Sequence, residues 1–415
     1  MKKKILIIGL YLPYPLSSGG HQAFFNSIDV LRYDADIHLL FIETRHNKAN
    51  QDILKKLWPE VKFHPYAISK RKFKDKNDFL TRLENKTLYF FQTHSKLGVE
   101  FSTCVRNYSI HFLDYINGII TNNSINIVQI EFIPRLSLVA ALPKTVKTVF
   151  VHHELRFSRH ELILREQNLI NSTYYKYKYN SLKTEELALL SLYDAIITLS
   201  DIDAQKLEIE GIPAQKIHSS FAIVRSDNTI RDDKYYIDAL SFVGPENHKP
   251  NKIGMEWFLD NCWSAILKKD NQLRLKIIGK WSAKTQKLWQ HKYKNIEFLG
   301  FVENLYEVLV DTIMIVPITV GSGIRMKILE AATMKIPFIT TEVGVEGLPF
   351  EDGEDCFISN DILEFANKIL KLKNDSILQK QFIRSANEKI KILYSPEKLR
   401  QTRMAVYNSI LLDNH

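Results

Sequence analysis

Short apolar runs alternate with amphipathic stretches along nearly the whole chain, and this rhythm restricts the fold more than any other feature of the sequence. The alternation is typical of βαβ units, which build parallel sheets. In the first half, the apolar runs predict strands over 4–8, 37–42, 127–131, 148–151 and 195–199. In the second half, they predict strands over 239–243, 273–278, 296–299, 312–316 and 338–341, a helix over 252–267 and helices throughout 361–413. We therefore expect an α/β protein.

The division into domains follows from length and from one charged segment. A chain of 415 residues is long enough for two or three domains. The stretch 225–236 is charged and has few core-forming residues, which predicts a linker between an N-terminal domain, 1–224, and a C-terminal domain, 237–395, with a final helix over 396–415. The alternation is interrupted over 45–115, which is polar, basic and aromatic. An insertion of this size in an α/β domain usually covers or extends a site.

Composition indicates a globular protein of the cytoplasm. Hydrophobic residues make up 45% and charged residues 25%, which is ordinary for globular proteins. No run of 18 apolar residues is present, so no transmembrane helix is expected. The first residues resemble a signal peptide, but the apolar stretch is short and no small-residue cleavage site follows, which favours a buried first strand. Three cysteines, Cys104, Cys262 and Cys356, have no metal-binding spacing and suit a reducing compartment.

The net charge of +9 favours acidic partners such as phosphorylated substrates, anionic lipids or nucleic acid. Basic residues cluster over 70–76, and tyrosine alternates with lysine over 174–179. Interleaved aromatic and basic residues suit a membrane interface or a nucleic-acid strand, and the plainer interpretation is a solvated loop. No recognisable nucleic-acid module is present, so we do not expect nucleic acid as a partner.

The most informative segment lies over 312–341, where an apolar strand runs into the glycine loop Gly321-Ser322-Gly323. A helix is predicted to start at about Ile324 and to carry Arg325, Lys327 and Glu330 in its first turns. Glycines allow the backbone to approach a ligand closely, and the N–H groups and dipole of a helix N-terminus favour phosphate. A glutamate further along accepts hydrogen bonds from vicinal hydroxyls. The segment therefore predicts a site for a diphosphate attached to a sugar.

This segment resembles the donor-binding motif of glycosyltransferase family 4, in the subset that reads Gly-x-Gly-x-Arg-x-Lys-x-x-Glu-Ala. The resemblance implies that Glu330 contacts the nucleotide ribose and that Arg325 and Lys327 contact the diphosphate of a UDP- or GDP-linked sugar. Two positions depart from the family pattern. Ser322 stands where most members have a glutamate that contacts the donor sugar, and Lys335 stands where they have a glycine before Ile336-Pro337.

Two loops of the first half also match the family. The loop over 13–21, with Gly19, Gly20 and His21, follows the first strand, and in the family it lies near the donor phosphates and the acceptor. The segment 151–156 matches a His-Glu step whose histidine reaches the donor sugar. Either His152 or His153 fills that role, and we favour His153 because Glu154 follows it; Arg156 is predicted to hold a phosphate or the acceptor. Plain βα turns and a surface histidine pair are the alternatives.

Three further segments match more weakly. In the loop over 242–251, Gly244 and Lys249 are predicted to contact the donor, with Lys249 in place of the usual arginine and lysine. Backbone groups around Phe301 are predicted to frame the nucleobase. In the glycine loop, Gly323 and Ile324 are predicted to contact the donor. Over 193–203, Ser200 or Asp201 is predicted to cap a helix, which is a structural role.

The resemblance implies a GT-B fold, with two Rossmann-like domains facing a central cleft and the C-terminal helix crossing back to the first. It implies retention at the anomeric carbon without an enzyme nucleophile, in bacterial cell-surface glycan or glycolipid assembly. The N-terminal half would handle the acceptor, so we place acceptor or membrane recognition in the insertion, at the inner face of the membrane. No metal site and no Asp-x-Asp motif is apparent, so a metal-independent reaction without a cofactor is expected. The alternative is an inactive nucleotide-sugar-binding protein.

Overall fold

The chain forms two compact units. The computed structural model describes residues 2–16, 18–44, 47–67, 80, 83, 86–87, 104–166, 168–224, 237–321 and 323–412. Contacts divide the chain into a first unit of Met1–Leu16, Gly20–Ala222 and Pro396–His415, and a second of Ser17–Gly19 and Ile223–Ser395. The basic cluster 70–76, the predicted linker 225–236, Ser322 and much of the 45–115 insertion lie outside the described residues. The expected cleft between the two domains stays a prediction.

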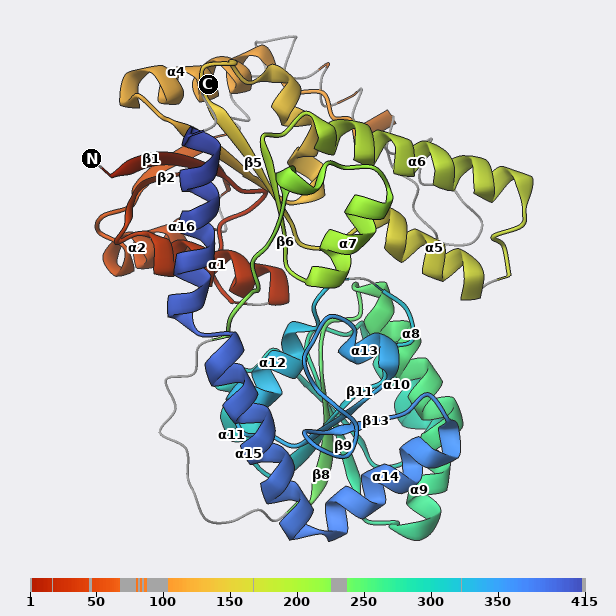
Figure 1. Cartoon of the computed structure of the whole chain (residues 1–415). Helices are drawn as coiled ribbons and strands as arrows, with labels where there is room; N and C mark the ends of the chain where they lie inside the picture. Colours follow the sequence, from red (N-terminus) through yellow and green to blue (C-terminus); the bar gives the residue numbers. More distant parts are fainter. Residues whose placement is uncertain are drawn as a thin grey trace. The chain divides into compact units, whose positions relative to one another are not determined.

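The first unit is built on a seven-stranded parallel sheet in the order β3-β2-β1-β4-β5-β6-β7 (Figure 1). Its strands are β1 (Lys3–Ile8), β2 (Ala35–Glu43), β3 (Lys62–Ala67), β4 (Ile127–Glu131), β5 (Lys147–His152), β6 (Ala195–Thr198) and β7 (Ile217–Ser219). The central strand β1 carries a wholly buried run from Ile5 to Ile8, which pairs with β2 on one side and β4 on the other. All five strands predicted for this half are present.

Both edge strands were missed by the sequence pattern. The β3 strand lies inside the stretch that we interpreted as a polar insertion, and that interpretation was wrong over Lys62–Ala67. None of its residues is fully buried, and Pro65 removes one backbone donor, as is common at a sheet edge. The β7 strand has only three residues. Edge strands such as these lack the continuous apolar run that marks a strand buried on both faces.

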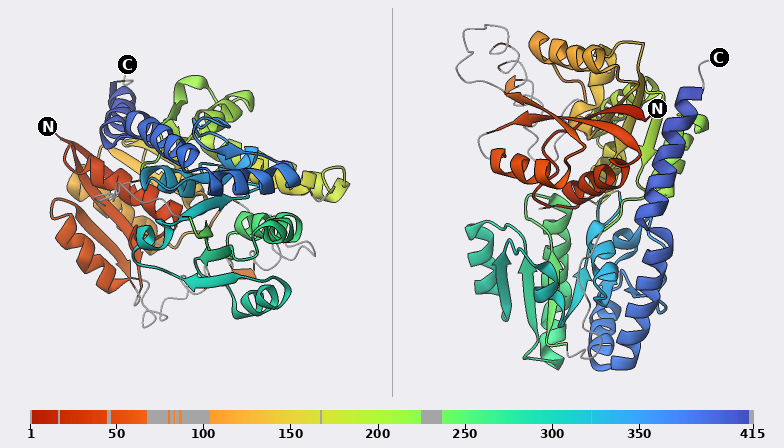
Figure 2. Two further views of the ribbon diagram at one scale, coloured as in Figure 1. Left: turned by 90° about the horizontal axis from the view of Figure 1, so that it is seen from below. Right: turned by 90° about the vertical axis from the view of Figure 1, so that its left-hand side faces the viewer.

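Helices cover both faces of this sheet, and the last helix of the chain is one of them (Figures 1 and 2). The described helices are α1 (Gly19–Leu31), α2 (Lys48–Leu57), α4 (Ile110–Asn123), η2 (Ile133–Ala141), α5 (Arg156–Glu166), α6 (Thr173–Ser191), α7 (Asp201–Ile209), η3 (Ala214–Lys216) and α16 (Pro396–Leu412). The Ser200 hydroxyl accepts a hydrogen bond from the Asp203 N–H at 3.1 Å, which confirms the predicted cap of α7. Because α16 belongs to the first unit, the expected return of the C-terminal helix is confirmed.

The second unit has a six-stranded parallel sheet in the order β10-β9-β8-β11-β12-β13, with helices on both faces (Figures 1 and 2). Its strands are β8 (Ala239–Val243), β9 (Arg274–Ile278), β10 (Ile296–Gly300), β11 (Thr312–Val316), β12 (Phe338–Thr340) and β13 (Phe357–Ile358). Its helices are α8 (Lys249–Phe258), η4 (Leu259–Trp263), α9 (Ser264–Lys269), α10 (Ala283–Lys292), α11 (Leu305–Leu309), α12 (Met326–Thr333), α13 (Glu342–Val345), α14 (Ile362–Asn374) and α15 (Ser376–Leu393). The predicted strands of this half are confirmed, and the two-residue β13 was missed.

The two sheets share one topology. In each, the strand order steps outward in one direction from the first strand and then reverses, as in doubly wound Rossmann-like sheets. The reversal lies between β1 and β4 in the first unit and between β8 and β11 in the second. Ligands bind such sheets outside the carboxyl ends of the strands at the reversal. The loops after β1, β4, β8 and β11 are therefore where each unit offers a site.

Lys335 occupies a conformation that favours glycine. Its φ is +58°, and it follows α12 with the Ile336 N–H donating to the Ala331 carbonyl at 2.8 Å, which is the hydrogen bond of a Schellman cap. Glycine adopts this backbone without the strain that a side chain brings. We expect Lys335→Gly to stabilise the protein by about 1 kcal/mol, raising Tm by about 2–4 °C. Thermal unfolding followed by circular dichroism checks this, and an unchanged or lower Tm contradicts it.

Candidate functional site

The glycine loop after β11 has the backbone geometry that its sequence predicted. Gly321 has a φ of +132° and Gly323 a φ of +77°, and both values favour glycine. The helix α12 begins at Met326, so the start predicted at about Ile324 was two residues too early. Arg325 is 8% exposed, and its guanidinium donates to the carbonyls of Gly323 and Val343. In this structure Arg325 therefore stabilises the glycine loop. The sequence had predicted that it contacts the diphosphate.

Lys327 lies in the first turn of α12 and is half-buried. Its Nζ donates to Asn251 Oδ1 at 2.7 Å and lies 4.3 Å from the centre of the Phe242 ring. Burial, and next the charge of Arg325, lower the pKa of Lys327 to about 7, although the charge of Glu330 acts in the opposite direction. A lysine whose charge is this poorly compensated binds an anion at little desolvation cost, because that cost has been met in folding.

The loop after β8 is joined to Lys327 through Asn251. Gly244 has a φ of +151°, and a Cβ there would collide with the Asn251 side chain. Asn251 Nδ2 donates to the Pro245 carbonyl at 2.9 Å while its Oδ1 accepts from Lys327. The two segments predicted separately to bind a donor are thus held together by one amide. Lys249, the first residue of α8, is exposed.

Glu330 and Phe301 complete the predicted donor residues of the second unit. Glu330 is 5% exposed on α12, and its charge acts on the Lys327 ammonium. Phe301 follows β10 and is 64% exposed. The loop that carries it lies next to the others, because the Gly279 N–H donates to the Gly300 carbonyl at 2.7 Å and the Gly244 N–H donates to the Ile278 carbonyl at 2.8 Å. The structure therefore gathers the loops after β8, β9 and β10 at the same edge as the glycine loop.

In the first unit, four rings form a continuous stack beyond the ends of β1, β4 and β5. The stack comprises His21, Tyr11, Phe132 and His153. His21 stacks on Tyr11 with centroids 4.1 Å apart, Tyr11 lies 4.7 Å from Phe132, and Phe132 stacks on His153 at 4.2 Å. Phe132 adopts a φ of +71°, which is rare for a bulky residue. The stack sits at the reversal of the sheet, where a ligand is expected.

The two adjacent histidines have different surroundings. His152 is 1% exposed, and its Nε2 lies 2.9 Å from Glu186 Oε1. Glu186 also accepts the backbone N–H groups of Arg156 and Phe157, both at 3.0 Å, so it caps α5 and secures His152 as part of the core. His153 has a side chain that is 13% exposed and pairs with Glu131 at 2.6 Å. Of the pair, His153 is the one whose side chain is partly exposed.

Gly19, Gly20, His21 and Arg156 lie on the loops or helix starts expected for them. Gly19 and Gly20 open α1, and a Cβ on Gly20 would come within 2.9 Å of the Tyr11 hydroxyl. Burial lowers the pKa of His21 to about 4, so this ring is neutral near pH 7. Arg156 opens α5, and its Nη1 lies 4.0 Å from Cys104 Sγ.

Several residues that build these sites were absent from the predicted set. Asn251 was part of a recognised motif, and only its two hydrogen bonds show that it links two loops. Glu131 ends a fully buried strand, and a carboxylate in that position is a signal that sequence reasoning passed over. Gln129, Arg403 and Tyr407 carry no local signal, since Tyr407 meets Gln129 across 278 positions of sequence.

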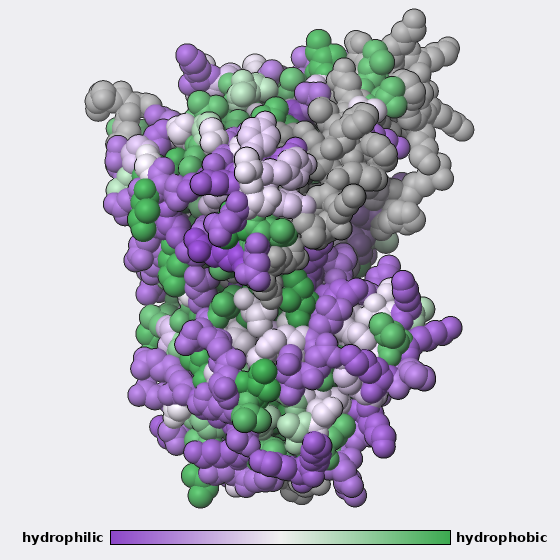
Figure 3. Space-filling view, turned by 90° about the vertical axis from the view of Figure 1, so that its right-hand side faces the viewer, coloured by the Kyte–Doolittle hydropathy of each residue, from purple (hydrophilic) through white to green (hydrophobic). Residues whose placement is uncertain are grey.

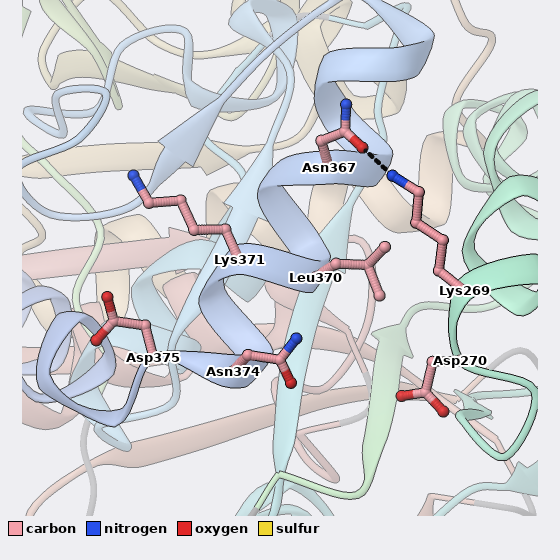
Figure 4. Close-up of a pocket in the computed structure, with 7 residues that line it drawn as sticks. All are labelled: Lys269, Asp270, Asn367, Leu370, Lys371, Asn374 and Asp375. Carbon is pink, nitrogen blue, oxygen red and sulfur yellow. Dashed lines mark hydrogen bonds between the residues drawn. The ribbon is translucent and has the colours of Figure 1, made fainter.

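The described residues include no group of three or more His, Cys, Asp or Glu side chains arranged to hold a metal ion. A surface pocket in the second unit is lined by Lys269, Asp270, Lys371 and Asp375, among others (Figure 4). Asp270 precedes β9, so this pocket lies at the amino ends of the strands, and its Lys269 is already bonded to Asn367 at 2.9 Å. It is opposite to the edge where such sheets bind ligands.

Comparisons with known proteins give matches for the second unit and for the whole chain. Residues 238–375 match the family described as glycosyl transferases group 1. The chain is 22% identical over 425 residues to an uncharacterized 44.6 kDa protein in the cps region of Klebsiella pneumoniae, covering 99% of this chain and 100% of that protein. It is 28% identical over 151 residues to poly(ribitol-phosphate) alpha-N-acetylglucosaminyltransferase of Staphylococcus aureus (strain COL), covering 35% of this chain and 31% of that enzyme.

Among solved structures, a TarM mutant of S. aureus in complex with Fondaparinux, alpha-GlcNAc-glycerol and UDP superposes with a TM-score of 0.67, at 16% identity, over 98% of this chain and 100% of that one. The fold is therefore GT-B, built from two parallel-sheet Rossmann-like domains, as expected. The family match in the second unit supports a glycosyltransferase, and the likeness to the solved structure shows the fold.

Proposed function

We propose that this protein is a retaining glycosyltransferase of family 4 that transfers a sugar from a nucleoside diphosphate sugar to an acceptor hydroxyl during assembly of a bacterial cell-surface glycan. The observation that carries the proposal is the meeting of the glycine loop, Lys327 and Asn251 at the reversal of the second sheet. That meeting lies within the residues that match the family. It joins a cationic side chain to a loop whose backbone N–H groups suit phosphate oxygens.

The second unit supplies the donor site in this proposal. The N–H groups of Gly323 and Ile324, with Lys327 and Lys249, bind the diphosphate, and Arg325 holds the loop and adds its charge; the Met326 and Ile328 N–H groups already donate to the Ile324 and Arg325 carbonyls. Glu330 accepts hydrogen bonds from the ribose hydroxyls. The backbone near Phe301 frames the base, and Gly244 allows the chain to pass close to the phosphates. Uridine diphosphate is the nucleotide in the TarM complex, and we take a UDP-sugar as the donor.

The first unit supplies groups for the sugar and the acceptor. His153 contacts the donor sugar near the reacting carbon, while Gly19 and Gly20 let the first loop approach the phosphates. His21 and Arg156 contact the acceptor or a phosphate. The acceptor oxygen bonds to the anomeric carbon on the face from which the diphosphate leaves, the bond from that carbon to the phosphate oxygen breaks, and the hydroxyl proton passes to the leaving phosphate. Cationic side chains stabilise the charge that develops there, which makes the reaction metal-independent.

The tyrosine–lysine run of α6 is the described part of the proposed membrane contact. Tyr174 is 54% exposed and Tyr177 is 65% exposed, whereas Tyr179 is buried and bonded to Glu161. None of the described helices has the length and apolar character needed to cross a membrane. On the face in Figure 3, hydrophobic side chains are scattered among hydrophilic ones rather than gathered in a patch. Peripheral attachment at the inner face of the membrane would therefore rest on tyrosine and lysine contacts with anionic headgroups.

Sugar transfer is tested directly with the purified protein. UDP- and GDP-linked sugars are incubated with glycan and polyol-phosphate acceptors, released nucleotide is measured, and the anomeric configuration of the product is read by NMR. We expect release of UDP that depends on acceptor, with the α- or β-configuration of the donor kept in the product. Inversion would contradict the retaining assignment. Tight UDP binding without turnover on any acceptor would instead favour the inactive nucleotide-sugar-binding protein, for which the serine at position 322 is the motive.

A further inference from the structure

A chain of buried polar groups runs from the C-terminal helix to His153. The Tyr407 hydroxyl on α16 donates to Gln129 Oε1, and Gln129 Nε2 donates to Glu131 Oε1 at 2.6 Å. The other carboxylate oxygen, Oε2, lies 2.6 Å from His153 Nε2. Gln129 and Glu131 are two residues apart on β4, so their side chains share one face of the sheet. Three separate elements of the first unit therefore meet in one hydrogen-bonded series.

The series has a defined direction. A phenol donates to an amide oxygen, the amide nitrogen donates to a carboxylate, and a carboxylate has only lone pairs to offer the histidine. His153 Nε2 must then carry its proton and donate it to Glu131. In the neutral ring the remaining nitrogen, Nδ1, is a hydrogen-bond acceptor. The contacts beneath the ring therefore select both the tautomer and the nitrogen that a ligand meets.

A buried arginine of the C-terminal helix interacts electrostatically with Glu131. Glu131 is 1% exposed and Arg403, also on α16, is 2% exposed, and their charges interact. Among the residues that the structure describes, the Nε and Nη1 atoms of Arg403 have no hydrogen-bond partner. Burying a guanidinium this way is costly, and apolar side chains would dock the helix at lower cost. Leu399, Val406 and Ile410 already provide such docking, so Arg403 and the Tyr407 hydroxyl are not needed for packing alone.

We propose that Gln129, Glu131, Arg403 and Tyr407 position His153, so that the C-terminal helix sets which ring nitrogen the histidine offers to the donor sugar. The expected effect of these residues on kcat rests on the proposed function. These four are positioning residues, because they act through His153 rather than on the substrate. The stacking of His153 on Phe132 fixes the plane of the ring, and the Glu131 bond fixes its rotation within that plane.

The neighbouring His152–Glu186 pair provides the contrast. Glu186 is wholly buried and accepts two backbone N–H groups as well as His152, which accounts for it as a cap of α5. Within the described chain, Glu131 has no such structural role, because its side-chain hydrogen bonds go to Gln129 and His153. A carboxylate buried for one histidine is the arrangement that orients functional imidazoles.

The test uses the full chain with Tyr407→Phe and Glu131→Gln, and Tyr193→Phe as the matched control. Tyr193 is also wholly buried in the first unit and also donates one hydrogen bond, to the Leu136 carbonyl at 2.6 Å. The readouts are kcat, the Kd for UDP, Tm, and the tautomer of His153 by ¹⁵N NMR of the histidine rings, assigned with a His153→Asn sample. Glu131→Gln keeps the shape of the side chain and removes its charge.

We expect Glu131→Gln to lower kcat about 10-fold and to abolish the single Nε2–H tautomer of His153, with the Kd for UDP changed less than about 2-fold. We expect Tyr407→Phe to lower kcat about 3-fold more than Tyr193→Phe does, at a similar loss of Tm. Equal kcat losses in the two tyrosine variants, or an unchanged tautomer in Glu131→Gln, would overturn the proposal. The NMR readout does not need turnover. A wild type without transferase activity would contradict the proposed function, and the tautomer of His153 would still test whether these residues position the ring.

Discussion

Replacing Glu330 with glutamine should weaken UDP binding by about 30- to 100-fold, which corresponds to about 2–3 kcal/mol. The proposed function gives this carboxylate two ribose hydroxyls, and a hydrogen bond to a charged acceptor contributes about 1.5–3 kcal/mol. Glutamine has the same shape, so the packing of this residue, which is 5% exposed, is kept. Isothermal titration of UDP into the wild type and the variant measures the change.

Glu342→Gln is the matched control for this experiment. Glu342 is exposed at the start of α13 and pairs with Asn360 Nδ2 at 2.7 Å, so its substitution removes a carboxylate from the same unit outside the proposed site. We expect it to leave the Kd for UDP within about 2-fold, since isolated surface contacts contribute little. Uridine provides a second check, because it keeps the ribose and lacks the diphosphate, so its binding should also weaken in Glu330→Gln. If Glu330→Gln binds UDP as the wild type does, the ribose role is wrong.

Lys327→Met should weaken UDP binding by about 50-fold near pH 7 and should also remove a pH dependence. The pKa of Lys327 is lowered to about 7, first by burial, so the free protein loses this charge above pH 7. A diphosphate favours the protonated lysine and raises its pKa, so binding takes up a proton above pH 7. Wild-type affinity should therefore fall by up to about 10-fold per pH unit above that point.

The measurement is UDP titration between pH 7.5 and 8.5, where a terminal phosphate with a second pKa of about 6 is already ionised. Lys327→Arg keeps a permanent charge, and we expect its affinity to be level across this range. Lys284→Met removes an exposed lysine of the second unit and should keep the wild-type slope. A level profile in the wild type, or an equal slope in Lys327→Arg, would show that this lysine does not titrate against the diphosphate.

The same lysine predicts an effect on stability. Because its pKa in the fold lies below the ordinary 10.5, the unfolded chain binds more protons between pH 7 and 10.5, and the free energy of unfolding rises with pH across that window. Lys327→Met removes this contribution, so the variant should be at least as stable as the wild type near pH 7. The buried charge of Lys327 lowers the stability of the fold. Residues that lower stability in this way are expected at functional sites.

Much of the architecture was predictable because parallel strands buried on both faces leave a strong local signal. The runs 5–8, 127–131 and 312–316 are continuously buried in the structure, and each lies within a strand predicted from its mostly apolar residues. Glycines were equally informative, since Gly321 and Gly323 adopt the backbone that their residue type suits. The edge strand Lys62–Ala67 failed because a half-exposed strand with a proline has neither signal.

The amino-acid sequence by itself determined the parallel α/β class, the glycine loop and the set of residues proposed to grip a diphosphate, because helix periodicity, buried runs and backbone permissiveness act within a few neighbouring residues. Only the tertiary structure decided which histidine is core and which is partly exposed, that Asn251 joins two loops, and that Tyr407 reaches Gln129 across 278 positions. Those choices depend on which side chains packing brings within hydrogen-bond distance, and that distance is not encoded in any local stretch of chain.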